Sequence, residues 1–215
     1  MIKVIIFDCW GTLFTNSQSP HPFEQFAKKL GRTMSDRSFV KLFEFHIMQN
    51  AYDDLEIPIN ALLSDLKVSY KEIISTELKE ILLHSIPTQI AYPDTMENLI
   101  SLKERYKLVL LTNSFKQGYE GLDSKFGISK IFCHVITSFE AHRIKPDIQL
   151  FKDAIVSTPF TPSEIVMIGD NLHDDVEPAN SLGLHTILLD RKNKYPEAKN
   201  RVTTLEKVQE LISFL

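Results

Sequence analysis

The hydrophobic pattern of the chain divides it into two kinds of sequence. Residues 1–14 and 86–215 hold short apolar runs, rich in β-branched residues, that alternate with amphipathic helical patterns. Residues 15–85 carry helical periodicity alone. Because alternating strands and helices are typical of a parallel sheet covered on both faces, we expect an α/β protein. Its fold would be a doubly wound, Rossmann-like core with an all-helical cap domain (15–85) inserted after the first strand.

The apolar runs predict five core strands, at 4–7, 107–111, 135–137, 165–168 and 185–189. The patterns between them predict core helices at 94–105, 116–126, 147–156, 174–182 and 204–214. The polar, Pro-bounded stretch 14–22 is interpreted as a linker.

Four helices are expected in the cap, beginning near Phe23, after Ser35, at Pro58 and near Ile73. The second carries a stripe formed by Phe39, Phe43, Phe45 and Met48. Such a stripe is usually core, so we expect it to pack inside the cap. The alternative is that one edge of the stripe faces the active site.

Composition narrows the function classes. The formal net charge of −4 argues against general nucleic-acid binding, and no apolar run is long enough to cross a bilayer. The chain opens directly on the first predicted strand, so no signal peptide is expected. Its cysteines, Cys9 and Cys133, offer neither a disulfide framework nor a zinc-binding spacing. We therefore expect a cytoplasmic protein, a monomer or homodimer, that contacts neither nucleic acid nor membrane.

Residues whose side chains can react or bind ligands follow several predicted strands. Asp8 ends the first strand, where the carboxyl edge of an open α/β sheet binds its ligands. Later strand ends and loops of the core add Thr112, Asn113, Ser114, Lys145, Asp170, Asn171, Asp174 and Asp175. Each alone has an ordinary explanation, such as helix capping. Their joint occurrence in this order favours a single site.

The charges of this set indicate a metal ion and an anionic substrate. Asp8 and Asp170 would repel each other at one site, and a divalent cation with oxygen ligands, Mg²⁺ above all, removes that cost. Lys145 can bind an anionic group of the substrate. Thr112 and Asn113, with nearby backbone N–H groups, can hold phosphoryl oxygens. The set therefore suits attack of Asp8 on the phosphorus of a small phosphorylated molecule.

Four motifs in this order resemble those of the haloacid dehalogenase-like (HAD) hydrolase superfamily, in the branch with a helical cap after the first motif. They lie at 7–13 (FDCWGTL), 110–114 (LLTNS), 143–147 (RIKPD) and 167–176 (MIGDNLHDDV). The resemblance covers nearly the whole chain. It implies that Asp8 is the nucleophile, that Thr112 and Asn113 bind the phosphoryl group, and that Lys145 stabilises charge.

The resemblance also implies the metal ligands. Mg²⁺ would be held by Asp8, Asp170 and the backbone carbonyl of Trp10. Residues that orient those ligands without binding the metal themselves would be Asn171, Asp174 and Asp175. The side chains of Trp10 and Ser114 would face the substrate or the cap.

One position departs from the phosphatases of this superfamily. They carry a second Asp two residues after the nucleophile, which protonates the leaving oxygen and later activates water. This chain has Trp10 there, and an indole N–H is neither acid nor base at neutral pH. The haloacid dehalogenases carry Tyr at that position, but they need no metal and have Ser where this chain has Asp170. The sequence thus combines a phosphatase-type metal site with a first motif nearer the dehalogenases.

Three functions follow from this mixture. The leading one is a Mg²⁺-dependent hydrolase of a phosphorylated small molecule, in which His21 or His46 of the cap is the candidate for replacing the missing acid. The second is a 2-haloacid dehalogenase, with Arg32 or Arg37 binding halide or carboxylate. The third is a protein that binds a phosphorylated ligand with negligible turnover.

Overall fold

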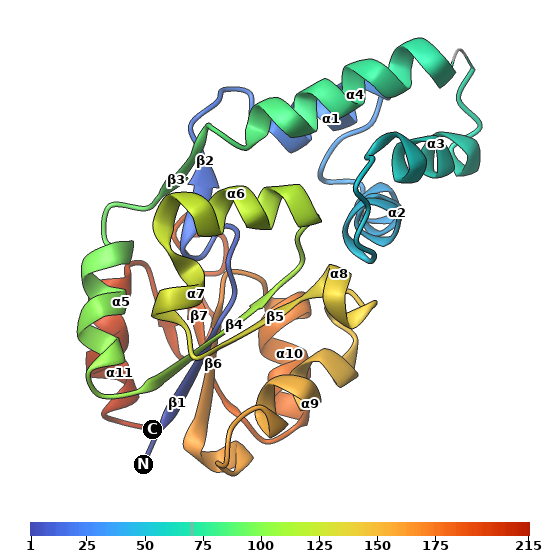
Figure 1. The fold of residues 1–215 in the computed structure, drawn as a ribbon. Coiled ribbons are helices and arrows are strands. Elements are labelled where there is room, and N and C mark those ends of the chain that lie inside the picture. The colour runs from blue at the N-terminus through green and yellow to red at the C-terminus, as the bar shows by residue number, and fades with distance from the viewer. Residues whose placement is uncertain (70) are drawn as a thin grey trace.

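A computed structural model describes residues 1–69 and 71–215 of the chain. The core is a six-stranded sheet in the order β5-β4-β1-β6-β7-β8, in which every neighbouring pair is parallel. Its strands are β1 (Val4–Phe7), β4 (Lys107–Thr112), β5 (His134–Thr137), β6 (Ile165–Gly169), β7 (His185–Leu189) and β8 (Arg201–Val202). The predicted parallel-sheet core is confirmed (Figure 1).

Helices cover both faces of this sheet (Figure 1). One face packs against α5 (Thr95–Lys103), α6 (Lys116–Phe126), α7 (Ile128–Ile131) and α11 (Val208–Ile212). The other packs against α9 (Ile148–Val156) and α10 (Glu177–Ser181). Alternate residues of β1 pack on opposite faces of the sheet. Ile5 and Phe7 lie on one face, and Val4 and Ile6 lie on the other. Because β1 is buried on both faces, its sequence is a continuous apolar run.

Several short elements differ from the prediction. β2 (Phe14–Asn16) occupies the start of the stretch interpreted as a linker and pairs antiparallel with β3 (Gln89–Ala91). The elements β8, α7 and α8 (Ser138–Ala141) are likewise absent from the prediction. Elements this short are not identified by a hydrophobic period, and the β2–β3 pair joins segments far apart in the chain.

In the described part of the chain, the cap consists of four helices, α1 (Pro22–Lys29), α2 (Arg37–Met48), α3 (Glu56–Asp65) and α4 (Lys71–Ser85). They lie together beyond the end of the core toward which the sheet strands run (Figure 1). They enclose a hydrophobic core of their own, with Phe26, Phe43 and Leu62 fully buried. The all-helical cap is confirmed, while its boundaries at 15–85 stay a prediction. None of the helices in the described ranges has the length and apolar composition that a bilayer crossing requires.

The aromatic stripe of α2 divides between two environments. Phe39, Phe43 and Met48 are buried, as predicted for the core of the cap. Phe45 is 49% exposed, so its assignment to that core was wrong. It lies two residues after Phe43, which places it near the opposite side of an α-helix. Its ring packs edge-on against the ring of His46.

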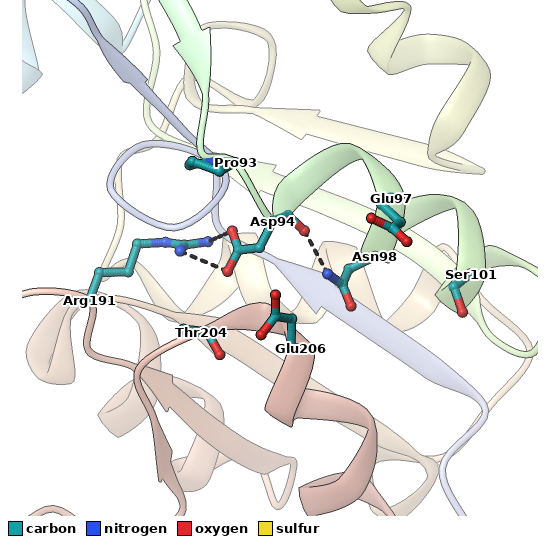
Figure 2. A pocket seen from close by; sticks show the side chains of 8 residues that line it. All are labelled: Pro93, Asp94, Glu97, Asn98, Ser101, Arg191, Thr204 and Glu206. Carbon is teal, nitrogen blue, oxygen red and sulfur yellow. Dashed lines mark hydrogen bonds and ion pairs between the residues drawn. The ribbon is translucent and has the colours of Figure 1, made fainter.

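An ion pair between Asp94 and Arg191 ties three segments of the core together (Figure 2). The Arg191 guanidinium donates to both Asp94 carboxylate oxygens, at 3.0 and 2.8 Å. Its Nε donates to the Thr12 carbonyl at 2.9 Å, and the group stacks over the Tyr92 ring. Asp94 also accepts the Leu205 backbone N–H at 2.8 Å. The pair therefore joins the turn after β1, the chain returning from the cap and the C-terminal segment.

We expect Arg191→Met to lower the free energy of unfolding by ~3 kcal/mol, since it leaves the largely buried Asp94 carboxylate without its cation. Urea denaturation measures this loss. The matched control is Arg105→Met, because Arg105 is an exposed arginine of the same core. Equal losses in the two variants would show that the Asp94–Arg191 pair does not hold these segments together.

Candidate active site

The end of β1 places Asp8 at the carboxyl edge of the sheet, where it is buried. Its backbone N–H donates to the Ile168 carbonyl at 2.9 Å, which continues the β1–β6 ladder by one residue. Both carboxylate oxygens have donors: Thr12 Oγ1 lies 2.6 Å from Oδ2, and Lys145 Nζ lies 2.7 Å from Oδ1. The Asp8 carboxylate is thereby fixed in one orientation.

Lys145 links two carboxylates. Its Nζ also donates to Asp175 Oδ1, at 2.6 Å. Burial alone would lower the pKa of the Lys145 ammonium, but Asp175 and Asp8 raise that pKa overall, so the group is a cation at neutral pH. The backbone of Lys145 is held by Asn113, whose Oδ1 accepts the Lys145 N–H at 2.8 Å. Asn113 therefore sets the position from which the ammonium reaches Asp8.

Asp175 belongs to a π-helical turn, Leu172–Val176, between β6 and α10. Its Oδ2 accepts the Asn171 backbone N–H at 3.1 Å. A Cβ added to Gly169 would lie 2.2 Å from the same oxygen, so only glycine leaves room for this carboxylate. Burial raises the pKa of Asp175, while the Lys145 ammonium opposes that rise.

Three carboxylates converge at this edge. Oxygens of Asp8, Asp170 and Asp175 all lie within 4.8 Å of one another. Among residues 1–69 and 71–215, Asp170 has no hydrogen-bond or ion-pair partner for its carboxylate. Burial and the charge of Asp8 raise the pKa of Asp170 to about 6. Gly11, at φ +85°, leaves the space that the Asp170 carboxylate fills. The cluster combines three carboxylates, whose oxygens are hard metal ligands, with one ammonium, and one of the carboxylates has no partner among the described residues. This arrangement fits a divalent cation such as Mg²⁺.

The remaining predicted residues lie around this cluster. Asn171 Nδ2 donates to Asp174 Oδ2 at 2.5 Å, so these two form a pair of their own. The Thr112 hydroxyl is buried and donates weakly to the Asn113 carbonyl, at 3.3 Å. Ser114 is buried, with its hydroxyl on the Phe115 carbonyl at 3.3 Å. The structure thus brings all the predicted residues to one edge, and their roles stay predictions.

A cavity of about 120 Å³ opens on this cluster. Its lining comprises Asp8, Trp10, Phe23, Glu44, Met48, Asn113, Lys145, Asp170, Asn171, Asp174 and Asp175. An adjoining cavity of about 350 Å³ shares Glu44, Lys145, Asn171 and Asp174 with it. That larger space extends between the cap and the core, and its polar lining includes Ser35, Arg37, Ser38 and Lys41. The smaller cavity, which has the size of a phosphoryl group, therefore opens into the larger one, which can hold the rest of a small, polar molecule.

The cap histidines do not reach the smaller cavity. His46 Nε2 pairs with Asp65 at 2.9 Å on the cap. His21 caps α1 and lines a further cavity that shares Trp10 and Phe23 with the smaller one. Arg37 lines the larger cavity, whereas Arg32 is exposed.

Two polar side chains at the site, Thr12 and Glu44, are not among the predicted site residues. Thr12 lies in the first motif, but nothing in the motif reveals its contact with Asp8. Glu44 lies on the polar side of a helix, where a glutamate is ordinarily solvated, and the sequence carries no signal for its position.

Comparisons with known proteins identify related sequences and folds. The sequence model of the haloacid dehalogenase-like hydrolases matches residues 2–183. The glyceraldehyde 3-phosphate phosphatase of Methanocaldococcus jannaschii is 29% identical over 231 residues, covering 100% of this chain and 97% of that protein. A HAD phosphatase structure from Thermococcus onnurineus matches with a TM-score of 0.64 at 25% identity, over 98% of both chains. A 2-haloacid dehalogenase from Pseudomonas syringae reaches 0.68 at 19% identity, over 100% of this chain and 99% of that one, a likeness of fold.

The variant Lys145→Met tests the charge balance of the site without any substrate. It leaves buried Asp8 and Asp175 without a cation, which should lower the free energy of unfolding by ~3–5 kcal/mol at neutral pH. Burial raises the pKa of Asp175 in the folded protein, and removing Lys145 takes away the charge that opposes this rise. The loss should therefore shrink as the pH falls and Asp175 takes up a proton.

Urea denaturation in the presence of a chelator, at about pH 8 and about pH 5, measures both effects. Lys152→Met, at an exposed lysine of α9, is the control and should change neither value. A loss in Lys145→Met that does not vary with pH contradicts the proposed charge balance.

Proposed function

The chain belongs to the haloacid dehalogenase-like hydrolases, and from this premise we propose that it is a Mg²⁺-dependent phosphatase of small phosphorylated molecules with Asp8 as the nucleophile. The observation that carries the proposal is the setting of Asp8. Its carboxylate is held by Thr12 and Lys145 within 4.8 Å of the Asp170 carboxylate, which has no partner among the described residues. A dehalogenase, which needs no metal, has no use for a second carboxylate at this place.

The residues of the site have different roles in phosphoryl transfer. Thr12 and Lys145 orient the Asp8 carboxylate so that one oxygen can attack phosphorus in line with the departing oxygen. The Lys145 ammonium faces the same cavity and attracts the phosphoryl oxygens. Asn113 keeps Lys145 in place through its backbone. Asp175 holds the ammonium from the far side, so that it cannot move away from Asp8.

Asp8, Asp170 and the Trp10 backbone carbonyl would hold Mg²⁺. Bound there, the ion would neutralise the carboxylates and the charge of the phosphoryl group. Asp174 and Asn171, which pair with each other at the rim of the cavity, would orient water around it.

The substrate class follows from the cavities and from the relatives. The Methanocaldococcus jannaschii protein, matched over 97% of its length, is named as a glyceraldehyde 3-phosphate phosphatase. The larger cavity has polar walls, suited to hydroxyl or carbonyl groups. We therefore assign short phosphorylated polyols and aldehydes as the substrate class. The cytoplasmic location expected from the sequence suits such a substrate and stays a prediction.

Turnover of p-nitrophenyl phosphate with and without Mg²⁺ tests this function. We expect phosphate release that requires Mg²⁺ and falls to background in Asp8→Asn, because the amide is no nucleophile. Asp65→Asn, on the surface of the cap, is the matched control and should keep its activity.

The same assay with 2-chloropropionate and a chelator distinguishes the alternatives. Chloride release that needs no metal would establish a dehalogenase. Phosphate-ester binding without any turnover would establish a ligand-binding protein.

Titration calorimetry of Mg²⁺ tests the metal site apart from activity. Asp170→Asn should weaken binding strongly, because it removes a carboxylate that no other described residue binds. In the parent protein the affinity should fall as the pH drops below about 6, the raised pKa of Asp170, since protons then compete for that carboxylate. Equal affinity in parent and variant, or binding unchanged at low pH, would refute this ligand assignment.

A further inference from the structure

A carboxyl group from the cap enters the cavity that holds the nucleophile. Glu44 lies on α2 and lines the 120 Å³ cavity together with Asp8 and Lys145. The residues Phe39, Phe43 and Ile47 of the same helix are buried in the cap core. Helical geometry therefore turns Glu44 away from that core and toward the sheet edge.

The C-terminal end of α2 is anchored to the core, which fixes the place of Glu44. The Met48 carbonyl, one turn later, accepts the Ser138 hydroxyl at 2.7 Å. Just beyond the helix, Asn50 Oδ1 lies 2.8 Å from His142 Nδ1. Ser138 and His142 belong to the core segment that follows β5, and the Ser138 hydroxyl also accepts the Ser114 backbone N–H at 3.0 Å. Glu44 is thus held against the active site by contacts outside the site itself.

The surroundings of Glu44 favour a carboxyl group that exchanges its proton near neutral pH. Burial, then the charge of Asp174, raises the pKa of Glu44 to about 7, with Asp8 adding to the rise and Asn113 and Lys145 opposing it. Of the other charged or titratable groups nearby, Arg37 and Lys41 of α2 and His173 of the π-helical turn line the adjoining cavity. Within the described residues, Glu44 forms no ion pair that would keep it permanently ionised.

The position two residues after the nucleophile holds no acid. Trp10 lines the same cavity, but its indole can neither give nor take a proton at neutral pH. The departing alcohol oxygen needs a proton, and the water that completes the reaction must lose one. Within the cavity lining, Lys145 and Asp175 are paired with each other, and Asp174 accepts a hydrogen bond from Asn171. Asp170 is a proposed metal ligand.

We propose that Glu44 is the general acid and base of this enzyme, acting from the cap in place of a residue at position 10. The inference rests on the proposed phosphatase function. In the first step an Asp8 oxygen bonds to phosphorus, the bond from phosphorus to the alcohol oxygen breaks, and the protonated Glu44 gives its proton to that oxygen. The products are the free alcohol, the phosphorylated Asp8 and the Glu44 carboxylate.

In the second step the Glu44 carboxylate takes a proton from water. The water oxygen bonds to phosphorus and the bond from phosphorus to Asp8 breaks. Inorganic phosphate leaves, the Asp8 carboxylate is restored, and Glu44 is protonated for the next cycle. One water is consumed for each ester hydrolysed.

The isosteric variant Glu44→Gln tests this role with two esters. Ethyl phosphate has a basic leaving group, so its kcat should fall by ~10²–10⁴-fold, the usual value of general acid–base catalysis. With p-nitrophenyl phosphate the first step needs little protonation and should persist. Because the second step then lacks its base, the variant should release a larger rapid burst of p-nitrophenolate than the parent does, followed by slower turnover. The pH profile of kcat should also lose the ionisation of Glu44.

A rescue and two controls complete the experiment. Adding Trp10→Asp to Glu44→Gln restores an acid at position 10 and should recover kcat for ethyl phosphate. Glu44→Asp, which keeps the acid, should retain more activity than Glu44→Gln. Glu80→Gln, at an exposed glutamate of α4, should match the parent. Melting temperatures close to that of the parent show that the variants are folded.

The outcomes separate this proposal from the phosphatase function itself. If Glu44→Gln keeps its kcat on ethyl phosphate, or if KM alone changes and by the same factor for both esters, Glu44 binds or positions substrate and the proposal is wrong. The Asp8-dependent activity of the parent would still establish a phosphatase. A parent without Asp8-dependent turnover of either ester overturns both proposals.

Discussion

The concentration of negative charge at the carboxyl edge of the sheet is the constraint on which the site depends. Asp8, Asp170 and Asp175 meet within 4.8 Å, and Lys145 supplies one ammonium between two of them. Buried like charges at this distance are unfavourable unless cations compensate them. The Lys145 ammonium neutralises part of that charge. Asp170, whose carboxylate has no partner in the described part of the chain, is where a further cation would bind.

The backbone around the cluster is built to permit this density of carboxylates. Gly11 and Gly169 leave the space in which the Asp170 and Asp175 carboxylates lie, since a Cβ at either position would come within 2.6 and 2.2 Å of a carboxylate oxygen. The Asn113 side chain fixes Lys145 through its backbone. The cap then closes the cavity with Phe23, Glu44 and Met48, and its α2 helix is anchored to the core beside Ser114. The core therefore supplies the charged groups of the site. The cap closes the cavity and carries Glu44, the residue proposed to exchange protons.

The sequence predicts the core well because its strands are buried and its polar residues stand at strand ends. The runs that become β1 and β6 are continuous apolar segments, and the residues after β1, β4 and β6 carry the carboxylates and amides. The sheet order then brings those ends together, which is why Asp8 and Asp170 could be placed at one site. Short elements such as β2 and β8 leave no period to detect.

The cap side of the site could not be predicted, because periodicity separates buried from polar positions and does not say what a polar position faces. Phe45 is of a residue type that is usually buried, but it lies on the outer side of α2. Glu44 is of a residue type that is usually solvated, but it lines the cavity that contains Asp8. The partners of Asp8 likewise depend on three-dimensional packing, as the 2.6 Å contact with Thr12 shows.

The most direct test of this account is to stop the protein with acid during turnover of p-nitrophenyl phosphate and to locate the phosphoryl group by peptide mass spectrometry. The account predicts an acid-stable, alkali-labile phosphoryl adduct on Asp8, formed with Mg²⁺ and absent in Asp8→Asn. Phosphate release at full rate without any adduct on Asp8, or with the adduct on another residue, would contradict it.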